Sequence, residues 1–196
     1  MDLALFTSAK ASAGVQLSAV EDGAFQYNEL EYVLVDRDSA FDPLDAGVEW
    51  QQHPDSVPNF GFSDSVLWLR LVIDNPAQHE AHRFLDVSYP LLDRVELRHM
   101  QGSRQLQVLV LGNQVDFEHR PINHRHLIFP VTLPADSSTT LYLGVNGGYA
   151  IQVPMALWSE PSFWRNDQKR LSWQTVYYGL MIAMIFYNLF LVWGVR

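Results

Sequence analysis

The sequence predicts an all-β domain, an antiparallel jelly roll or β-sandwich, followed by one C-terminal transmembrane helix. Short segments with alternating apolar and polar residues recur about every 8–12 residues, and turn residues separate them. No long amphipathic helix lies between these segments, which argues against an α/β fold. The last 25 or so residues are apolar and uncharged as far as residue 195.

Residues 1–28 are predicted to form an N-terminal tail ahead of the domain. Residues 3–6 are a short apolar run, and Ala11-Ser12-Ala13 fits the small-residue cleavage pattern of a secretory signal. The basic region that opens such a signal is absent. Two interpretations stay open, the remnant of a signal peptide and a disordered tail.

The domain itself is expected at residues 29–168, and its first strand at residues 30–36, which are rich in β-forming residues. Residues 43–48 are expected to make a short helical turn. Residues 54–64, with two prolines and a glycine, are expected to be a loop. The first part of the domain is therefore predicted to contain one strand and much irregular chain.

Residues 66–74 form the clearest predicted strand. Leucine or isoleucine occupies every second position from Leu67 to Ile73, which predicts a face buried in the core. The other face carries Trp68 and Arg70, a mixture that suits a half-exposed sheet face. Further strands follow the same alternation, and a Gln-Gly-Ser turn closes a hairpin. These strands are expected at residues 82–89, 93–111 (the hairpin), 125–133, 139–146 and 151–158.

Residues 171–195 predict a transmembrane helix, preceded by a short helix that Ser159 caps. About 25 residues of helix extend roughly 37 Å, whereas a hydrocarbon core of about 30 Å needs only about 20 residues. Trp173 and Trp193 lie near the two ends, as interfacial aromatic residues do. A buried core helix rarely lacks charge on every face.

Composition excludes several functions. The net charge of −9 argues against nucleic acid as a partner, because phosphate contacts need clustered basic residues. Because cysteine is absent, the chain has no disulfides, thiolate metal sites or cysteine nucleophiles. No catalytic motif and no cofactor motif is present, so we expect no enzyme activity. His124 and His126 could share one strand face, but this spacing alone predicts surface histidines better than a metal site.

Aromatic residues give the best candidates for ligand binding. A tryptophan beside an arginine on an open sheet face can stack on a sugar ring while the guanidinium binds hydroxyls or a carboxylate, and Trp68 and Arg70 have this relation. The alternative is that Trp68 packs under a loop and Arg70 pairs with an acid such as Asp86 or Asp93. Tyr149, which follows two glycines in a predicted loop, is a further candidate.

Several segments, in this order, resemble a known receptor family. They are residues 30–36 (LEYVLVD), 61–71 (GFSDSVLWLRL), Asn75-Pro76, residues 89–96 (YPLLDRVE), Arg120, and the helix segments 178–180 (YGL) and 187–189 (YNL). Together they look like the second type of extracellular domain of the 7TMR-DISM receptors, which are seven-transmembrane receptors with diverse intracellular signalling modules, followed by the first membrane helix. The resemblance covers about residues 29–196.

The resemblance implies a jelly-roll sensor that resembles carbohydrate-binding modules and lies in the periplasm, anchored in a bacterial inner membrane. It adds Arg120 to the candidate ligand-binding residues. It implies six further membrane helices and a cytoplasmic output, typically a diguanylate cyclase that makes cyclic-di-GMP or a histidine kinase. The predicted function is to sense a small, carbohydrate-like ligand and regulate that output. The alternative is an interaction module that holds receptor protomers together as a homodimer.

Overall fold

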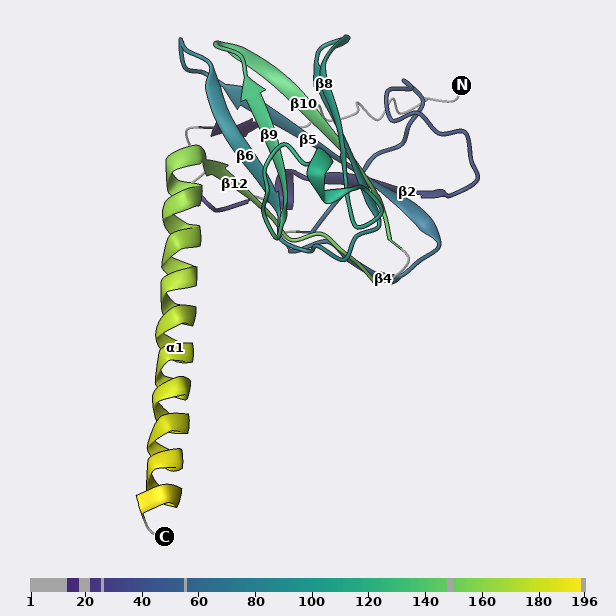
Figure 1. The fold of residues 1–196 in the computed structure, drawn as a ribbon. Coiled ribbons are helices and arrows are strands. Elements are labelled where there is room, and N and C mark those ends of the chain that lie inside the picture. The colour runs from purple at the N-terminus through teal and green to yellow at the C-terminus, as the bar shows by residue number, and fades with distance from the viewer. Residues whose placement is uncertain (1–13, 18–21, 26, 55, 148–149, 195–196) are drawn as a thin grey trace, which may run out of the picture. The chain divides into compact units, whose positions relative to one another are not determined.

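The computed structural model describes the chain except residues 1–13, 18–21, 26, 55, 148–149 and 195–196. The chain divides into two compact units, Met1–Trp158 and Ser159–Arg196. The first unit consists mainly of β-strands and the second of one helix (Figure 1). The prediction of an all-β domain with one C-terminal apolar helix is therefore confirmed, while jelly-roll connectivity stays a prediction.

The larger sheet of the first unit has the strand order β3-β2-β5-β10-β7-β8, and β1 pairs with β5 beside this path. The β1–β5 pair is parallel and the other pairs are antiparallel. Antiparallel neighbours let one face of a sheet be buried while the other stays open. The strands are β1 (Val15–Gln16), β2 (Glu31–Asp36), β3 (Gln51–Gln52), β5 (Ser65–Asn75), β7 (Arg94–Gln101), β8 (Arg104–Leu111) and β10 (Ser137–Asn146).

Two smaller sheets complete the domain. One has the order β12-β6-β9 and the other pairs β11 with β4. Short 3-10 helices, η2 (Tyr27–Glu29) and η3 (Phe117–His119), lie in the connections. The strands are β4 (Asn59–Phe62), β6 (Ala81–Val87), β9 (Leu127–Leu133), β11 (Ala150–Gln152) and β12 (Met155–Ser159).

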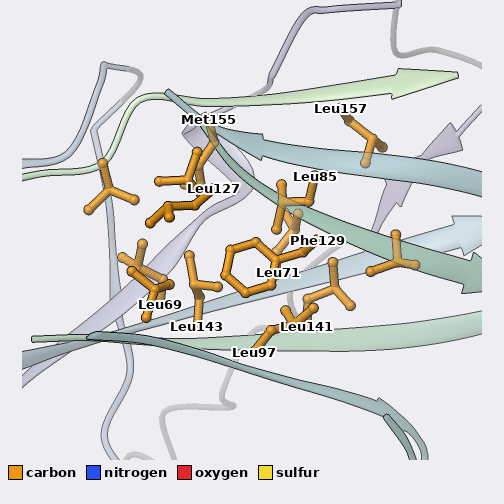
Figure 2. Close-up of a cluster of buried hydrophobic side chains, with 14 of the residues drawn as sticks. Leu69, Leu71, Leu85, Leu97, Leu127, Phe129, Leu141, Leu143, Met155 and Leu157 are labelled. Carbon is orange, nitrogen blue, oxygen red and sulfur yellow. The ribbon is translucent and has the colours of Figure 1, made fainter. Parts of the chain in front are cut away.

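One hydrophobic core lies between the larger sheet and the three-stranded sheet. Figure 2 shows Leu69 and Leu143 from the larger sheet in the same cluster as Leu85 and Phe129 from the smaller one. Phe129 is completely buried, with 0% of its surface exposed. The alternation predicted for residues 66–74 is confirmed, because the leucine and isoleucine positions of β5 are all buried.

Two stretches differ from the predicted strand pattern. Residues 54–64, expected to be a loop, contain β4. Residues 151–158, expected to be one strand, form β11 and β12 in different sheets. The reason is Pro154, which has no backbone N–H to donate to a neighbouring strand. Just before it, the Val153 N–H donates to the carbonyl of Pro58 at 3.0 Å, and beyond it the chain joins the other sheet.

The connection between β2 and β3 also differs from the prediction. Residues 43–48, predicted as a helical turn, form separate turns closed by Asp45 N–H to Asp42 carbonyl (3.2 Å) and Val48 N–H to Asp45 carbonyl (3.3 Å). No helix is assigned among these described residues. An aspartate side chain that bonds nearby backbone favours such turns over a helix, and here the Asp42 carboxylate accepts from the Leu44 N–H.

The described residues between 14 and 28, within the predicted tail, contribute to the fold. Val15 and Leu17 lie in the hydrophobic core. The Gly23 N–H donates to the carbonyl of Leu157 at 2.9 Å. The Tyr27 hydroxyl donates to the Met155 carbonyl at 3.1 Å and accepts from the Met155 N–H at 2.9 Å. The predicted signal-peptide remnant at residues 11–13 lies outside the described residues.

The second unit is helix α1 (Glu160–Gly194), one continuous helix of 35 residues. It replaces the expected short helix followed by a separate membrane helix. Among the described helices it is long and apolar enough to cross a membrane. Its basic residues lie before Leu171, and the apolar side chains beyond that point are largely exposed.

Candidate ligand-binding site

The larger sheet has a polar face on the side away from the core, which we call the outer face. On β5 this face carries Trp68 and Arg70. The register places Gly144 and Tyr142 of β10 directly opposite them. Glu96 of β7 lies opposite Gly144, so it shares this face. Every second residue of a strand points to the same side, so Arg94 and Arg98 share it too. The sheet therefore brings residues from three separate parts of the sequence onto one surface.

Residues 37–50, the connection between β2 and β3, pack on the outer face, and we call them the covering segment. The ring of Phe41 lies 6.1 Å from that of Trp68, and the Trp50 ring lies 5.8 Å from that of Tyr142. The carboxylate of Asp42 pairs with the guanidinium of Arg98 at 3.0 Å. These aromatic and charged contacts hold the covering segment against the sheet.

A pocket of about 190 Å³ lies between the covering segment and the outer face. At roughly 30 Å³ for each water in the liquid, this volume equals about six water molecules, which suits a ligand of monosaccharide size. Drug-sized ligands occupy larger clefts, of about 300 Å³ or more. The side chains that line it include Arg37, Phe41, Trp68, Arg94, Glu96 and Asn146.

Trp68 forms a tightly packed wall of this pocket. Only 8% of its surface is exposed. A Cβ atom at Gly144 would lie 2.7 Å from the indole ring, so a residue without a side chain is needed there. The guanidinium of Arg98 lies over the ring, 5.3 Å from its centre. Trp68 therefore offers a ligand a limited part of its ring.

The polar groups of the pocket come from both the covering segment and the sheet. Arg37 Nη2 donates to the amide Oδ1 of Asn146 at 2.8 Å. Glu96 Oε1 accepts from Arg98 Nε at 2.8 Å, and its Oε2 lies 3.5 Å from Arg94 Nη2. These groups can bind hydroxyls and charged atoms of a small polar molecule.

Arg70 shares the outer face with Trp68, as predicted, but it does not line the pocket. Its guanidinium forms an ion pair with Glu31, directly opposite on β2, and lies 4.8 Å from the centre of the Trp50 ring. The acid partner is thus Glu31 and not Asp86 or Asp93. Its role in ligand binding stays a prediction.

The other two predicted ligand-binding residues lie apart from this pocket or outside the described chain. Arg120 Nη1 donates to the His124 carbonyl at 3.3 Å and its Nη2 to the Gly112 carbonyl at 3.2 Å, while its guanidinium lies over the Phe117 ring. These contacts brace the connection between β8 and β9. Tyr149 lies outside the described residues.

The predicted histidine pair is brought close to a carboxylate from another strand. The rings of His124 and His126 lie edge to face at 4.9 Å, just before β9. His126 Nδ1 lies 3.0 Å from the Asp86 carboxylate on β6. Within the described part of the chain, no group of three or more histidine or acidic residues is arranged to hold a metal ion.

Sequence reasoning missed Arg37, Arg94 and Asn146 as pocket residues. The alternating charges of residues 94–98 were visible in the sequence, but nothing local shows that this strand joins the same sheet as Trp68. Arg37 lies in a polar turn, where no periodicity marks a binding residue. The pocket therefore depends on the pairing of β7 with β5 through β10.

The matched region is the β-domain just described. A family model for the 7TMR-DISM extracellular 2 domain matches residues 28–159, well over half of the chain, and the matched range runs from just before β2 to the end of β12. None of the curated proteins matches the chain. The match implies the sensing domain of a membrane receptor, in agreement with the apolar helix that follows it. The chain therefore belongs to the 7TMR-DISM extracellular 2 family.

Proposed function

We propose that this domain senses a small carbohydrate-like molecule, which binds in the pocket between the covering segment and the outer face. The observation that carries this proposal is the pocket itself, about 190 Å³ in volume and lined by both aromatic and hydrogen-bonding side chains. Sugar rings present apolar faces and polar edges, so they need both kinds of contact. A sensor with this role requires no catalytic residue.

The covering segment gives the ligand a way to influence the domain. A ligand that contacts both Arg37 of this segment and Arg94 of the sheet binds best when the segment is packed on the sheet. Such a ligand shifts the population toward that arrangement, by as much as its affinity differs between arrangements. The receptor, placed in a bacterial inner membrane with this domain in the periplasm, would pass the change to a diguanylate cyclase or a histidine kinase.

A second candidate function is self-association of receptor protomers. Strand β8 lies at one end of the strand order of the larger sheet, and its Val108 side chain is 45% exposed. An edge strand with exposed apolar residues can pair with a second copy. This candidate predicts dimers that form without any ligand.

The test is thermal unfolding of the full chain in detergent, with a panel of monosaccharides present. A ligand at 100 times its dissociation constant adds about 2.7 kcal/mol, which moves the unfolding midpoint by several degrees. The shift should decrease in Asn146→Ala, which removes a pocket side chain, and persist in Asn113→Ala, an exposed asparagine away from the pocket. Absence of any shift, together with concentration-dependent dimers, would favour the second candidate.

A further inference from the structure

We infer that the ligand of this pocket carries a carboxylate group, which Arg37 and Arg94 bind. The inference rests on the proposed function, because it assigns the charge of a molecule bound in the same pocket. Both guanidinium groups line the pocket, one from the covering segment and one from β7. The ligand class is a singly charged acid of monosaccharide size, such as a sugar acid.

The charges around the pocket are unequal. Arg98, which braces its wall, has two acidic partners, Asp42 at 3.0 Å and Glu96 at 2.8 Å. The one acidic partner of Arg94 among the described residues is the second oxygen of that same Glu96, at 3.5 Å. Charge-assisted bonds between guanidinium and carboxylate are usually about 2.7–2.9 Å long. Arg94 is therefore weakly paired, and its side chain is 53% exposed.

Arg37 has a neutral partner. Its Nη2 donates to the side-chain oxygen of Asn146, an amide that cannot balance the charge. The neighbouring Asp36 is the last residue of β2, where successive side chains point to opposite faces. Since Val35 lies opposite Val66 on the outer face, Asp36 belongs to the other face. Asp36 is one of the residues that line the pocket, but this alternation directs its carboxylate away from the outer face on which Arg37 meets Asn146.

Among the described residues, the carboxylates in contact with Arg94 and Arg98 are those of Glu96 and Asp42. The guanidinium of Arg37 contacts an amide instead and has no carboxylate partner among these residues. A single carboxylate balances it, whereas a phosphate group brings a charge of about −1.5 to −2. The planar guanidinium matches two oxygens of a carboxylate or of a phosphate, so its geometry favours an acid over a neutral sugar. The single charge favours a carboxylate over a sugar phosphate.

The experiment is calorimetric titration of the full chain in detergent with three matched probes: galacturonate, galactose and galactose 6-phosphate. Galacturonate should bind at least about tenfold more tightly than galactose, which is the fold-change expected from a charge-assisted hydrogen bond.

Arg37→Gln and Arg94→Gln should each remove most of this preference. Arg104→Gln, which makes the same charge change at an exposed position away from the pocket, should keep it. Gluconate, an open-chain acid, shows whether the sugar ring is needed as well. If it binds, and Arg37→Gln and Arg94→Gln weaken its binding, the assignment of a carboxylate is also supported.

Other results would overturn the inference in distinguishable ways. If galactose binds as tightly as galacturonate, and the affinity depends on Asn146 but not on Arg37 or Arg94, the carboxylate assignment fails while the proposed sensor function stands. Tighter binding of galactose 6-phosphate also removes the carboxylate assignment alone. An equal loss in Arg104→Gln shows that the acid binds elsewhere. If none of the sugars or sugar acids binds, both the inference and the carbohydrate-sensing proposal fail.

Discussion

The two faces of the larger sheet are stabilised in different ways, although the same strands supply both. From Leu67 to Ile73 the core face of β5 is apolar and buried against the smaller sheet. The outer face carries Trp68 and Arg70, held by ion pairs, ring contacts and one glycine. On the core face stability comes from the amount of apolar surface buried, which tolerates similar side chains. On the outer face it depends on the particular shape and charge of each partner.

The largest effect is expected in the hydrophobic core on which the core face packs, at Phe129 of the three-stranded sheet. Phe129→Ala should lower the free energy of unfolding by about 3–5 kcal/mol, because it removes a completely buried ring and leaves a cavity. Urea denaturation measures the loss. On the same strand, Thr132→Ala on the exposed face removes a hydroxyl 3.1 Å from His82 Nδ1 and should cost about 1 kcal/mol or less. Similar losses in both variants would mean that burial in this core does not determine stability as described.

A smaller loss is expected on the outer face, from adding a single methyl group. In Gly144→Ala the new Cβ would lie 2.7 Å from the Trp68 ring, so the ring must move. Overpacking of this kind costs about 1–3 kcal/mol, and the move should also change the shape of the pocket. The matched control is Gly47→Ala in the covering segment, where a Cβ meets no atom within 4 Å. If both variants unfold at the same urea concentration, Trp68 is not held by this contact.

His99 is a polar residue on the core face and gives that face a dependence on pH. It is 1% exposed, and burial lowers its pKa below the usual 6.5. As the pH falls below about 6.5, the unfolded chain takes up a proton that the folded chain does not, so the free energy of unfolding decreases until the lowered pKa is reached. Above that range the group has no such effect.

The measurement is urea denaturation of the wild type and of His99→Leu at pH 8 and at pH 5.5. When the pH is lowered from the first value to the second, the free energy of unfolding should decrease less in His99→Leu than in the wild type. The variant should fold well at pH 8, because His99 Nε2 finds no hydrogen-bond partner among the described residues. An unchanged pH dependence would contradict this account of His99.

The smallest effect is expected from the ion pairs of the outer face. Arg98→Gln removes the contacts to Asp42 and Glu96, which are partly open to solvent. Such pairs contribute at most about 1 kcal/mol, and salt screens them. The loss measured by urea denaturation should therefore shrink at high salt. A large loss that salt does not change would show that Arg98 acts through packing on the Trp68 ring instead.

The alternation within each strand could be predicted from the sequence, but the pairing between strands could not. The alternation in residues 66–74 is visible locally, so the prediction that Trp68 and Arg70 share one face is confirmed. The neighbour of each strand depends on contacts across the whole domain. For this reason the approach of Asp86 to His126, 40 positions apart, was missed. Strand β4 was also missed, because Pro58 and Gly61 give its short sequence the character of a loop.

The first and last segments of the β-domain complete each other, and this has a consequence for how the protein is made. Tyr27 and Met155, joined by two hydrogen bonds through the tyrosine hydroxyl, are 128 positions apart. At about 5–20 residues per second, a ribosome needs about 6–25 s to make the chain between them. Strand β12 ends at Ser159 and α1 begins at Glu160. The domain can close its two ends only when synthesis reaches the apolar helix, so its folding and the delivery of that helix coincide in time.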